Sequence, residues 1–115
     1  AWAAAPDRPI IALTGDGGFG QYMGELCTAV KYGMNITHIL INNRQLGKIS
    51  LEQETAGLSV WETGLHNPDF SQYAEICGAK GFRVQKLKEL EGAVTAALVH
   101  DGPALVEIIC DPVLI

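Results

Sequence analysis

Two patterns of hydrophobic and polar residues alternate along the chain. Residues 10–14 and 36–41 are short apolar runs rich in β-branched side chains, which predict buried strands. Between them, apolar residues recur at helical spacing and predict a helix over 21–32. The predicted buried residues of this helix are Met23, Leu26, Cys27 and Val30. Because a right-handed crossover makes the two strands parallel, both should end at the same edge of the sheet.

The remainder of the chain continues this alternation. The predicted elements are helices over 46–56, 68–77 and 87–100, a loop over 57–65, and strands over 80–85 and 104–110. This order predicts an α/β fold of three layers, in which a mainly parallel sheet carries helices on both faces. With 115 residues, 48% hydrophobic and 18% charged, the chain is expected to form one unit over residues 1–115.

Individual residues predict where helices begin and end. Gly33 follows the first helix and is expected to act as its C-cap. Asn67-Pro68-Asp69 predicts a helix start with Asn67 as the N-cap, so we expect a structural role for Asn67. The residues expected to be buried in the next two helices are Phe70, Tyr73, Ala74 and Cys77, then Leu87, Leu90, Val94, Ala97 and Leu98.

The segment 15–20 combines a glycine loop with an acidic residue. Its glycines match the dinucleotide pattern G-x-G-x-x-G, but that pattern requires an acid about 20 residues further on. Here the second strand ends in two carboxamides, Asn42 and Asn43. The charge of Asp16 would repel a diphosphate held by loop amides, and a divalent cation between them would remove this conflict. Mg²⁺ prefers such oxygen ligands together with phosphate oxygens.

Gly15-Asp16-Gly17, followed by 24 residues and then Asn42-Asn43, resembles the thiamine diphosphate motif of the thiamine-dependent enzymes. The two halves, their spacing and the intervening helix make this a specific signal. The resemblance implies a C-terminal cofactor-binding domain with the thiamine diphosphate-binding fold, incomplete at its N-terminal side.

The resemblance also implies roles for individual residues. Asp16 and Asn43 would bind Mg²⁺ through their side chains, and Gln45 through its backbone carbonyl. The backbone amides of Gly17, Gly18 and the Leu46-Gly47 segment would face the diphosphate. The complete set of implied cofactor-binding residues is Gly15, Asp16, Gly17, Gly18, Asn43, Gln45, Leu46 and Gly47. No catalytic residue is assigned within the chain.

Further segments resemble the pyruvate oxidase and acetolactate synthase branch of this family. They are residues 43–49, 65–70, 77–79 and 102–104. Ile49 occupies a position at which simple decarboxylases of the family commonly carry an acid, which counts against that group. The resemblance implies an enzyme that decarboxylates a 2-oxo acid such as pyruvate, with oxidation or carboligation of the intermediate. It also allows FAD in the complete protein.

In this family a glutamate from a separate pyrimidine-binding domain, of the same or a partner chain, activates the cofactor. No residue of this sequence matches that glutamate. We therefore expect the chain to be part of a longer, homo-oligomeric protein and to be inactive by itself. The surfaces that would meet the other domains should be apolar.

Charge and cysteine content narrow the remaining classes of function. A net charge of −5 and a pI near 5.0 offer no basic surface for nucleic acid or anionic membranes. No apolar run reaches the roughly 18 residues of a membrane span. Cys27, Cys77 and Cys110 lack metal-site or redox-motif spacing, which predicts buried structural thiols in a cytoplasmic protein.

The alternative to an enzyme domain is a nonenzymatic nucleotide- or flavin-binding module of Rossmann or flavodoxin type, and metal dependence of binding distinguishes the two. His38 is expected to be a hydrogen-bonded core histidine, and Glu107 an acid at a strand end or a partly covered face. The residues expected to form a solvated basic surface are Lys80, Arg83, Lys86 and Lys88.

Overall fold

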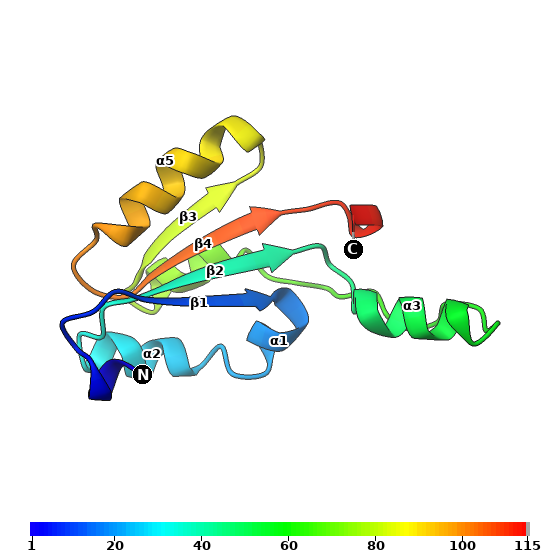
Figure 1. Cartoon of the computed structure of the whole chain (residues 1–115), viewed down its shortest axis with the longest axis horizontal. Helices are drawn as coiled ribbons and strands as arrows, with labels where there is room; N and C mark the ends of the chain where they lie inside the picture. Colours follow the sequence, from blue (N-terminus) through cyan, green and yellow to red (C-terminus); the bar gives the residue numbers. More distant parts are fainter. Residues whose placement is uncertain (115) are drawn as a thin grey trace.

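Four parallel strands form the centre of the computed structural model, which describes residues 1–114 (Figure 1). The strands are β1 (Ile10–Gly15), β2 (Ile36–Asn42), β3 (Lys80–Val84) and β4 (Ala104–Ile109), in the order β1-β2-β4-β3. Gly15 pairs with Ile41, and Asn42 pairs with Ile109. Three strands therefore end at one edge of the sheet, as the crossover argument predicted.

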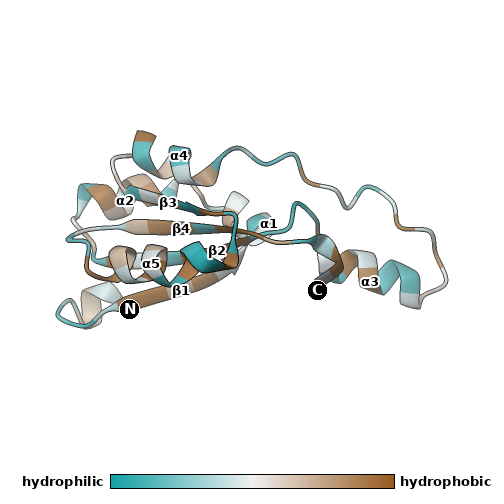
Figure 2. Cartoon of the chain, turned by 90° about the horizontal axis from the view of Figure 1, so that it is seen from above, coloured by the Kyte–Doolittle hydropathy of each residue, from teal (hydrophilic) through white to brown (hydrophobic). Residues whose placement is uncertain are grey.

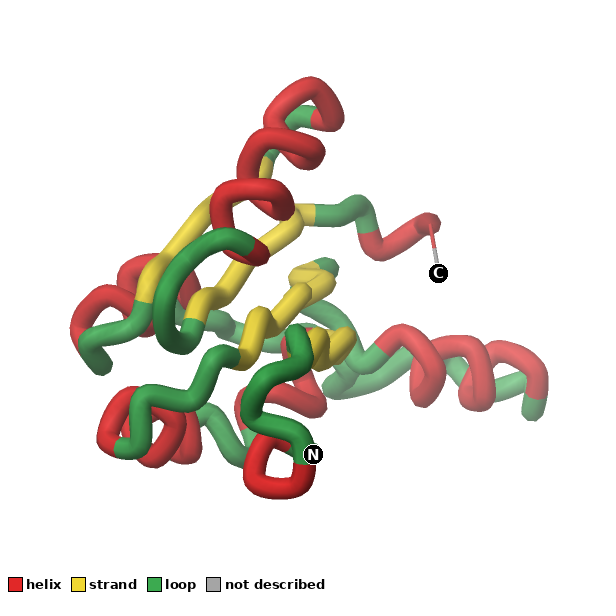
Figure 3. The backbone as a smooth tube through the Cα atoms, turned by 60° about the vertical axis from the view of Figure 1, so that its left-hand side comes forward, coloured by secondary structure: helices red, strands yellow, loops and turns green. Residues whose placement is uncertain are grey.

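Helices cover both faces of this sheet (Figure 3). They are α1 (Asp16–Gly20), α2 (Glu25–Lys31), α3 (Gly47–Thr55), α4 (Phe70–Ile76) and α5 (Leu87–Leu98), with short 3₁₀ turns at Trp2–Ala4 and Pro112–Leu114. Residues of α1, α2 and α4 share one core cluster, whereas α5 contributes to a second cluster on the opposite face. The predicted three-layer α/β fold is confirmed.

The first core cluster joins three helices to the two central strands. Leu40 and Leu105 alternate with residues of the other face and pack against Phe19 and Phe70. The two phenylalanine rings meet edge to face at 5.5 Å. Burying a side chain of this size contributes about 1.5–3 kcal/mol, so this cluster fixes the helices that follow β1 and precede β3.

The opposite face is only partly covered. Ala97 of α5 packs with buried Val106 of β4, but Ile11 and Leu13 of the edge strand β1 remain 57% and 70% exposed. With neighbouring residues of α5 they line a hollow of about 690 Å³. Figure 2 shows the strongly apolar colouring of β1 at this side of the sheet. An exposed apolar surface of this kind was expected for a domain that packs against others.

The predicted helix over 21–32 begins earlier and is interrupted. Helix α1 already starts within the predicted glycine loop, because one helical turn buries Phe19 in the core. Glycines do not favour a longer helix, and the chain turns at 21–24 before α2 begins. Gly33 follows α2 with a left-handed φ of 57°, as predicted for the helix end.

Two predictions of buried residues were partly wrong. Cys27 is exposed because Leu26 and Ala29 occupy the buried positions of α2, and Cys77 and Cys110 are only half-buried. In α5, Leu87 is 85% and Leu98 39% exposed, and Leu87 lines the uncovered hollow beside β1. Among residues 1–114, no helix is long and apolar enough to cross a membrane.

Helix α4 starts two residues later than predicted. Asp69, not Asn67, is its N-cap, and its Oδ1 accepts hydrogen bonds from the Gln72 amide at 2.9 Å and the Ser71 hydroxyl at 2.6 Å. The Asn67 side chain is instead bonded to Asp16 and Asn42, whereas Asp69 is held at the helix start by its contact with Arg83. The predicted capping role of Asn67 was therefore wrong.

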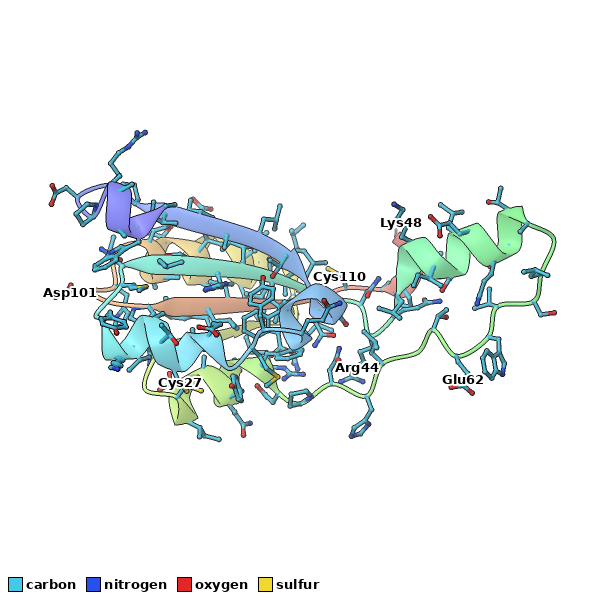
Figure 4. All side chains as sticks on the ribbon, turned by 90° about the horizontal axis from the view of Figure 1, so that it is seen from below. Cys27, Arg44, Lys48, Glu62, Asp101 and Cys110 are labelled. Atoms are coloured by element: carbon cyan, nitrogen blue, oxygen red, sulfur yellow. The ribbon has the colours of Figure 1, made fainter. Side chains whose placement is uncertain are left out.

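Helix α3 and the returning loop 56–66 form an arm that projects beyond the sheet (Figures 1 and 2). Backbone bonds close its base, from the Leu46 amide to the Thr63 carbonyl and from the Leu65 amide to the Arg44 carbonyl, each 2.8 Å. Figure 4 shows Arg44 at this base and Glu62 on the returning loop. Both the helix and the loop agree with the predicted elements.

Candidate functional site

A pocket of about 430 Å³ lies at the edge where β1 and β2 end. It is lined by all eight residues predicted to bind the cofactor, namely Gly15, Asp16, Gly17, Gly18, Asn43, Gln45, Leu46 and Gly47. Leu13, Ile41 and Ile49 contribute apolar walls. The fold thus brings together residues 15–18 and 43–47, two segments that lie far apart in the sequence.

Asp16 is held in this pocket by three hydrogen bonds. Its side chain is 3% exposed, and Oδ1 accepts a bond from the Gly17 amide at 2.9 Å. Oδ2 accepts two bonds, from the Arg44 amide at 2.8 Å and from the Asn67 side chain at 2.6 Å. Each carboxylate oxygen offers about two lone-pair positions. Oδ2 is therefore saturated, whereas Oδ1 retains one position for a ligand.

Asn43 lies beside this carboxylate, at the end of the neighbouring strand. It is buried, and its Oδ1 accepts a hydrogen bond from the Gln45 amide at 3.1 Å. That bond closes a tight turn in which Arg44 adopts a left-handed φ of 57°. The turn places the Arg44 amide beside Asp16. The hydrogen bond between them links Asp16 to the residue that follows Asn43, the other predicted ligand.

Gln45 contributes a backbone oxygen without a donor. Among the hydrogen bonds found in residues 1–114, none is accepted by the Gln45 carbonyl. The Gln45 side chain is fixed by its 2.6 Å bond to the Ser50 hydroxyl, which also contacts Thr63. The pocket therefore contains a carboxylate, a carboxamide oxygen and a carbonyl, which are the hard ligands that Mg²⁺ prefers.

This donor set differs from a cluster of acidic, histidine or cysteine side chains. Over residues 1–114 there is no group of three or more such side chains that could hold a metal ion. A single carboxylate balances only one of the two positive charges of a divalent cation. The ligand that binds with the cation must supply further negative charge, as a diphosphate does.

The family described as "Thiamine pyrophosphate enzyme, C-terminal TPP binding domain" matches residues 1–108. The chain belongs to this family. Thiamine pyrophosphate is another name for thiamine diphosphate, so the resemblance inferred from the motif is confirmed. The pocket at the end of β1 and β2 is accordingly a site in a thiamine diphosphate-binding domain.

Several curated proteins are similar to this domain. YdaP of Bacillus subtilis (strain 168), whose name describes it as containing thiamine pyrophosphate, is 46% identical over 103 residues, which are 90% of this chain and 18% of YdaP. A catabolic acetolactate synthase of Raoultella terrigena is 36% identical over 111 residues, 96% of this chain and 20% of that protein. The domain spans a fifth or less of each relative.

Solved structures agree with the fold. A thiamine diphosphate-dependent 4-hydroxybenzoylformate decarboxylase of Rhodococcus jostii RHA1 superimposes with a TM-score of 0.89 at 28% identity, over 96% of this chain and 21% of that one. Benzoylformate decarboxylase of Polynucleobacter necessarius gives a TM-score of 0.87 at 23% identity, over the same shares of the two chains. The second similarity shows the fold alone.

Behind the pocket, the thiamine diphosphate-binding domain contains a buried charge pair that sequence reasoning missed. Glu107, in the middle of β4, is 0% exposed, which contradicts the predicted strand-end or partly covered position. It accepts bonds from the Asn42 side chain at 2.7 Å, from Arg83 at 3.1 Å and from the Ser71 amide at 3.3 Å. The signal was present, since an acid within an apolar strand requires a partner.

Arg83 was wrongly assigned to a solvated basic surface. Its guanidinium bridges Glu107 and Asp69, at 3.1 and 2.6 Å. Burial opposes the ionisation of Asp69, but the hydrogen bonds from Ser71 and Gln72 and the contact with Arg83 together lower the pKa of its carboxyl. Arg83 therefore attaches the start of α4 to the two strands beneath it.

His38 lies on the face of β2 that packs against α1, where its ring meets Phe19 at 5.7 Å. Its buried Nδ1 has no hydrogen-bond partner within residues 1–114, so the predicted hydrogen-bonded histidine was wrong. Burial lowers the pKa of His38 below 6.5, because the charged ring is poorly solvated there.

This lowered pKa predicts a pH dependence of stability. His38 contributes stability above about pH 6.5, the ordinary pKa of histidine, and this contribution is lost as pH falls through the lower pKa of the folded state. In His38→Phe, the free energy of unfolding should fall less steeply below pH 6.5 than in the unaltered protein. Denaturant titrations across this range measure the slope, and exposed His66→Phe is the control. Equal slopes in the His38 variant and the unaltered protein would contradict the prediction.

Proposed function

We propose that this domain binds the diphosphate of thiamine diphosphate through Mg²⁺, within an enzyme that decarboxylates a 2-oxo acid. The observation that supports this most is the ligand arrangement around Asp16. One carboxylate oxygen is saturated by donors, and the other retains a free position in a pocket that Asn43 and Gln45 share. Asp16, Asn43 and the Gln45 carbonyl would hold the cation.

The diphosphate would lie against backbone amides of the same pocket. Gly47 is the first residue of α3, and Gly18 belongs to the first turn of α1, where amides have no carbonyl partner within the helix. The Leu46 amide already donates to Thr63 at 2.8 Å, so the implied role of that amide does not fit this structure. The Leu46 side chain instead covers Gly17, where a Cβ would lie 2.6 Å from Leu46 Cδ2.

Bound thiamine diphosphate supplies an electron sink for the carbanion formed by decarboxylation, and the protein supplies binding and orientation. Within this domain, Asp16 and Asn43 would fix the position of the cation, and the walls formed by Leu13, Ile41 and Ile49 would limit the access of water. We assign the activating acid to a pyrimidine-binding domain of the same or a partner chain.

The proposed substrate is pyruvate or a similar 2-oxo acid, followed by oxidation or carboligation. This assignment is supported by the relatives named acetolactate synthase, which perform carboligation by name, and by Ile49 at the position where simple decarboxylases of the family commonly have an acid. A homo-oligomeric complete protein, with or without FAD, is part of the same proposal.

The experiment replaces Asp16 in the full-length enzyme. Asp16→Ala should weaken Mg²⁺-dependent binding of thiamine diphosphate by at least about 100-fold, because loss of a ligand exceeds the roughly 10–100-fold cost of losing an outer partner. Calorimetric titration of cofactor at several Mg²⁺ concentrations measures it. Asp7→Ala, at an exposed carboxylate outside the pocket, is the control.

Unchanged affinity in Asp16→Ala would rule out this metal assignment. Tight binding of a nucleotide or flavin in the presence of a chelator, without binding of thiamine diphosphate, would instead support the nonenzymatic alternative. Asp16→Asn keeps the shape of the side chain, and a similar loss in this variant would show that the charge is required.

A further inference from the structure

Asn67 connects the ends of β1 and β2 through its side chain. Its Nδ2 donates hydrogen bonds to Asp16 Oδ2 at 2.6 Å and to Asn42 Oδ1 at 2.9 Å. Asn67 belongs to neither strand, and it lies in the loop between the arm and α4. We propose that Asn67 is a positioning residue, which orients the Asp16 carboxylate toward the divalent cation. This inference rests on the proposed function.

The two hydrogens of the Asn67 amide have separate acceptors. One is a carboxylate, and hydrogen bonds to a charged acceptor are about twice as strong as neutral ones. The other is Asn42, which is 1% exposed and whose Oδ1 has, within residues 1–114, only one further contact, with the Arg44 amide at 3.3 Å. Both acceptors are buried, so removing the donor leaves them without water to replace it.

The effect on Asp16 follows from its lone pairs. With Asn67 and Arg44 in place, Oδ2 has no position left, and only Oδ1 faces a ligand. Without Asn67, Oδ2 gains a free position and the carboxylate loses one of the three hydrogen bonds that resist its rotation. The cation would then meet a carboxylate of variable orientation, which weakens its binding but leaves every ligand present.

Asn67 is itself held from both sides. Pro68 restricts its backbone to extended conformations, and Asp69 attaches the chain to Arg83. On the other side, Asn42 is fixed by its 2.7 Å bond to the buried Glu107. A capping role cannot explain Asn67, because Asp69 is the N-cap of α4. Its side-chain hydrogen bonds go to Asp16, a proposed ligand, and to Asn42, which precedes the proposed ligand Asn43.

The test measures Mg²⁺ affinity in the full-length enzyme at saturating thiamine diphosphate. Asn67→Ala should raise the Kd for Mg²⁺ by about 10–100-fold, the usual effect of removing a partner of a metal ligand. Calorimetry gives the Kd, and thermal unfolding of the metal-free protein gives the stability separately. The matched control is Tyr73→Phe, which removes the 3.1 Å bond from the Tyr73 hydroxyl to the Met23 carbonyl at the adjoining helix.

Tyr73→Phe should lower the Tm of the metal-free protein and leave the Kd for Mg²⁺ unchanged. A Kd for Asn67→Ala within twofold of the unaltered enzyme would overturn the positioning role, as would an equal rise of Kd in Asn67→Ala and Tyr73→Phe. If Asn67→Ala does not fold, Asn67→Ser retains a donor of shorter reach and should raise the Kd severalfold. An unchanged Kd in that variant would also overturn the role.

Asp16→Ala separates this inference from the proposed function. If Asp16→Ala leaves Mg²⁺ binding unchanged, the metal assignment itself fails. If Asp16→Ala abolishes Mg²⁺ binding and Asn67→Ala does not weaken it, only the positioning role of Asn67 fails.

Discussion

Replacing Arg83 with methionine should lower the free energy of unfolding by about 3–5 kcal/mol, the usual cost of removing one partner of a buried ion pair. Glu107 is completely buried, and Arg83 supplies its only opposite charge within 4.0 Å in the part of the chain that is described, residues 1–114. In Arg83→Met, the carboxylate keeps its bonds from Asn42 and Ser71 but loses that charge. Denaturant unfolding of the purified protein measures the effect.

A second ion pair of the same strand provides the control. Lys80 contacts Glu75 at 2.9 Å, but both side chains are nearly half exposed to solvent. Lys80→Met should therefore cost no more than about 1 kcal/mol. Combining Arg83→Met with Glu107→Gln should recover part of the stability, since no unpaired charge is then buried. Equal losses for Arg83→Met and Lys80→Met would show that the buried pair has no special role.

The pocket at the ends of β1 and β2 could be predicted because its residues are specified locally. Asp16 and Asn43 each follow directly after a strand that an apolar run predicts, and parallel strands place such positions at one edge of the sheet. The glycine-to-asparagine motif then indicated which of these residues to consider. All eight predicted residues consequently line one pocket.

Asn67 could not be assigned from the sequence, because two residues on either side of Pro68 satisfied the same local rule. In Asn67-Pro68-Asp69, either Asn67 or Asp69 is a suitable N-cap. The choice depends on Arg83, which lies on another strand and holds Asp69, and on Asp16, which accepts a bond from Asn67. These are tertiary contacts between distant segments, and local propensity contains no information about them.

The early start of α1 has a similar cause. Its sequence contains three glycines and has little tendency to form a helix. The burial of Phe19 against Phe70 and Leu40 offsets this tendency, since one helical turn brings the ring into the core. The amphipathic pattern could locate α2, but the helical turn before it depends on packing.

Gly81→Ala should lower the free energy of unfolding by about 3 kcal/mol, at the upper end of the cost of overpacking a core. A Cβ at this position would overlap the Ser71 carbonyl oxygen and lie 2.8 Å from the carbonyl carbon. The obstacle is backbone and cannot rotate away. Because the Ser71 amide donates to Glu107, moving the start of α4 would also weaken the buried charge pair.

At Gly92, the same change to alanine should raise the free energy of unfolding. Gly92 lies within α5, and no atom outside its own helix lies within 4 Å of a Cβ built there. Gly92→Ala should stabilise the protein by roughly 0.5–1 kcal/mol, because alanine loses less conformational freedom in a helix. Denaturant unfolding should thus give changes of opposite sign for the two variants. A loss below 1 kcal/mol for Gly81→Ala would mean that α4 can move away from β3 at little cost, and that its first turn does not fix the loop containing Asn67.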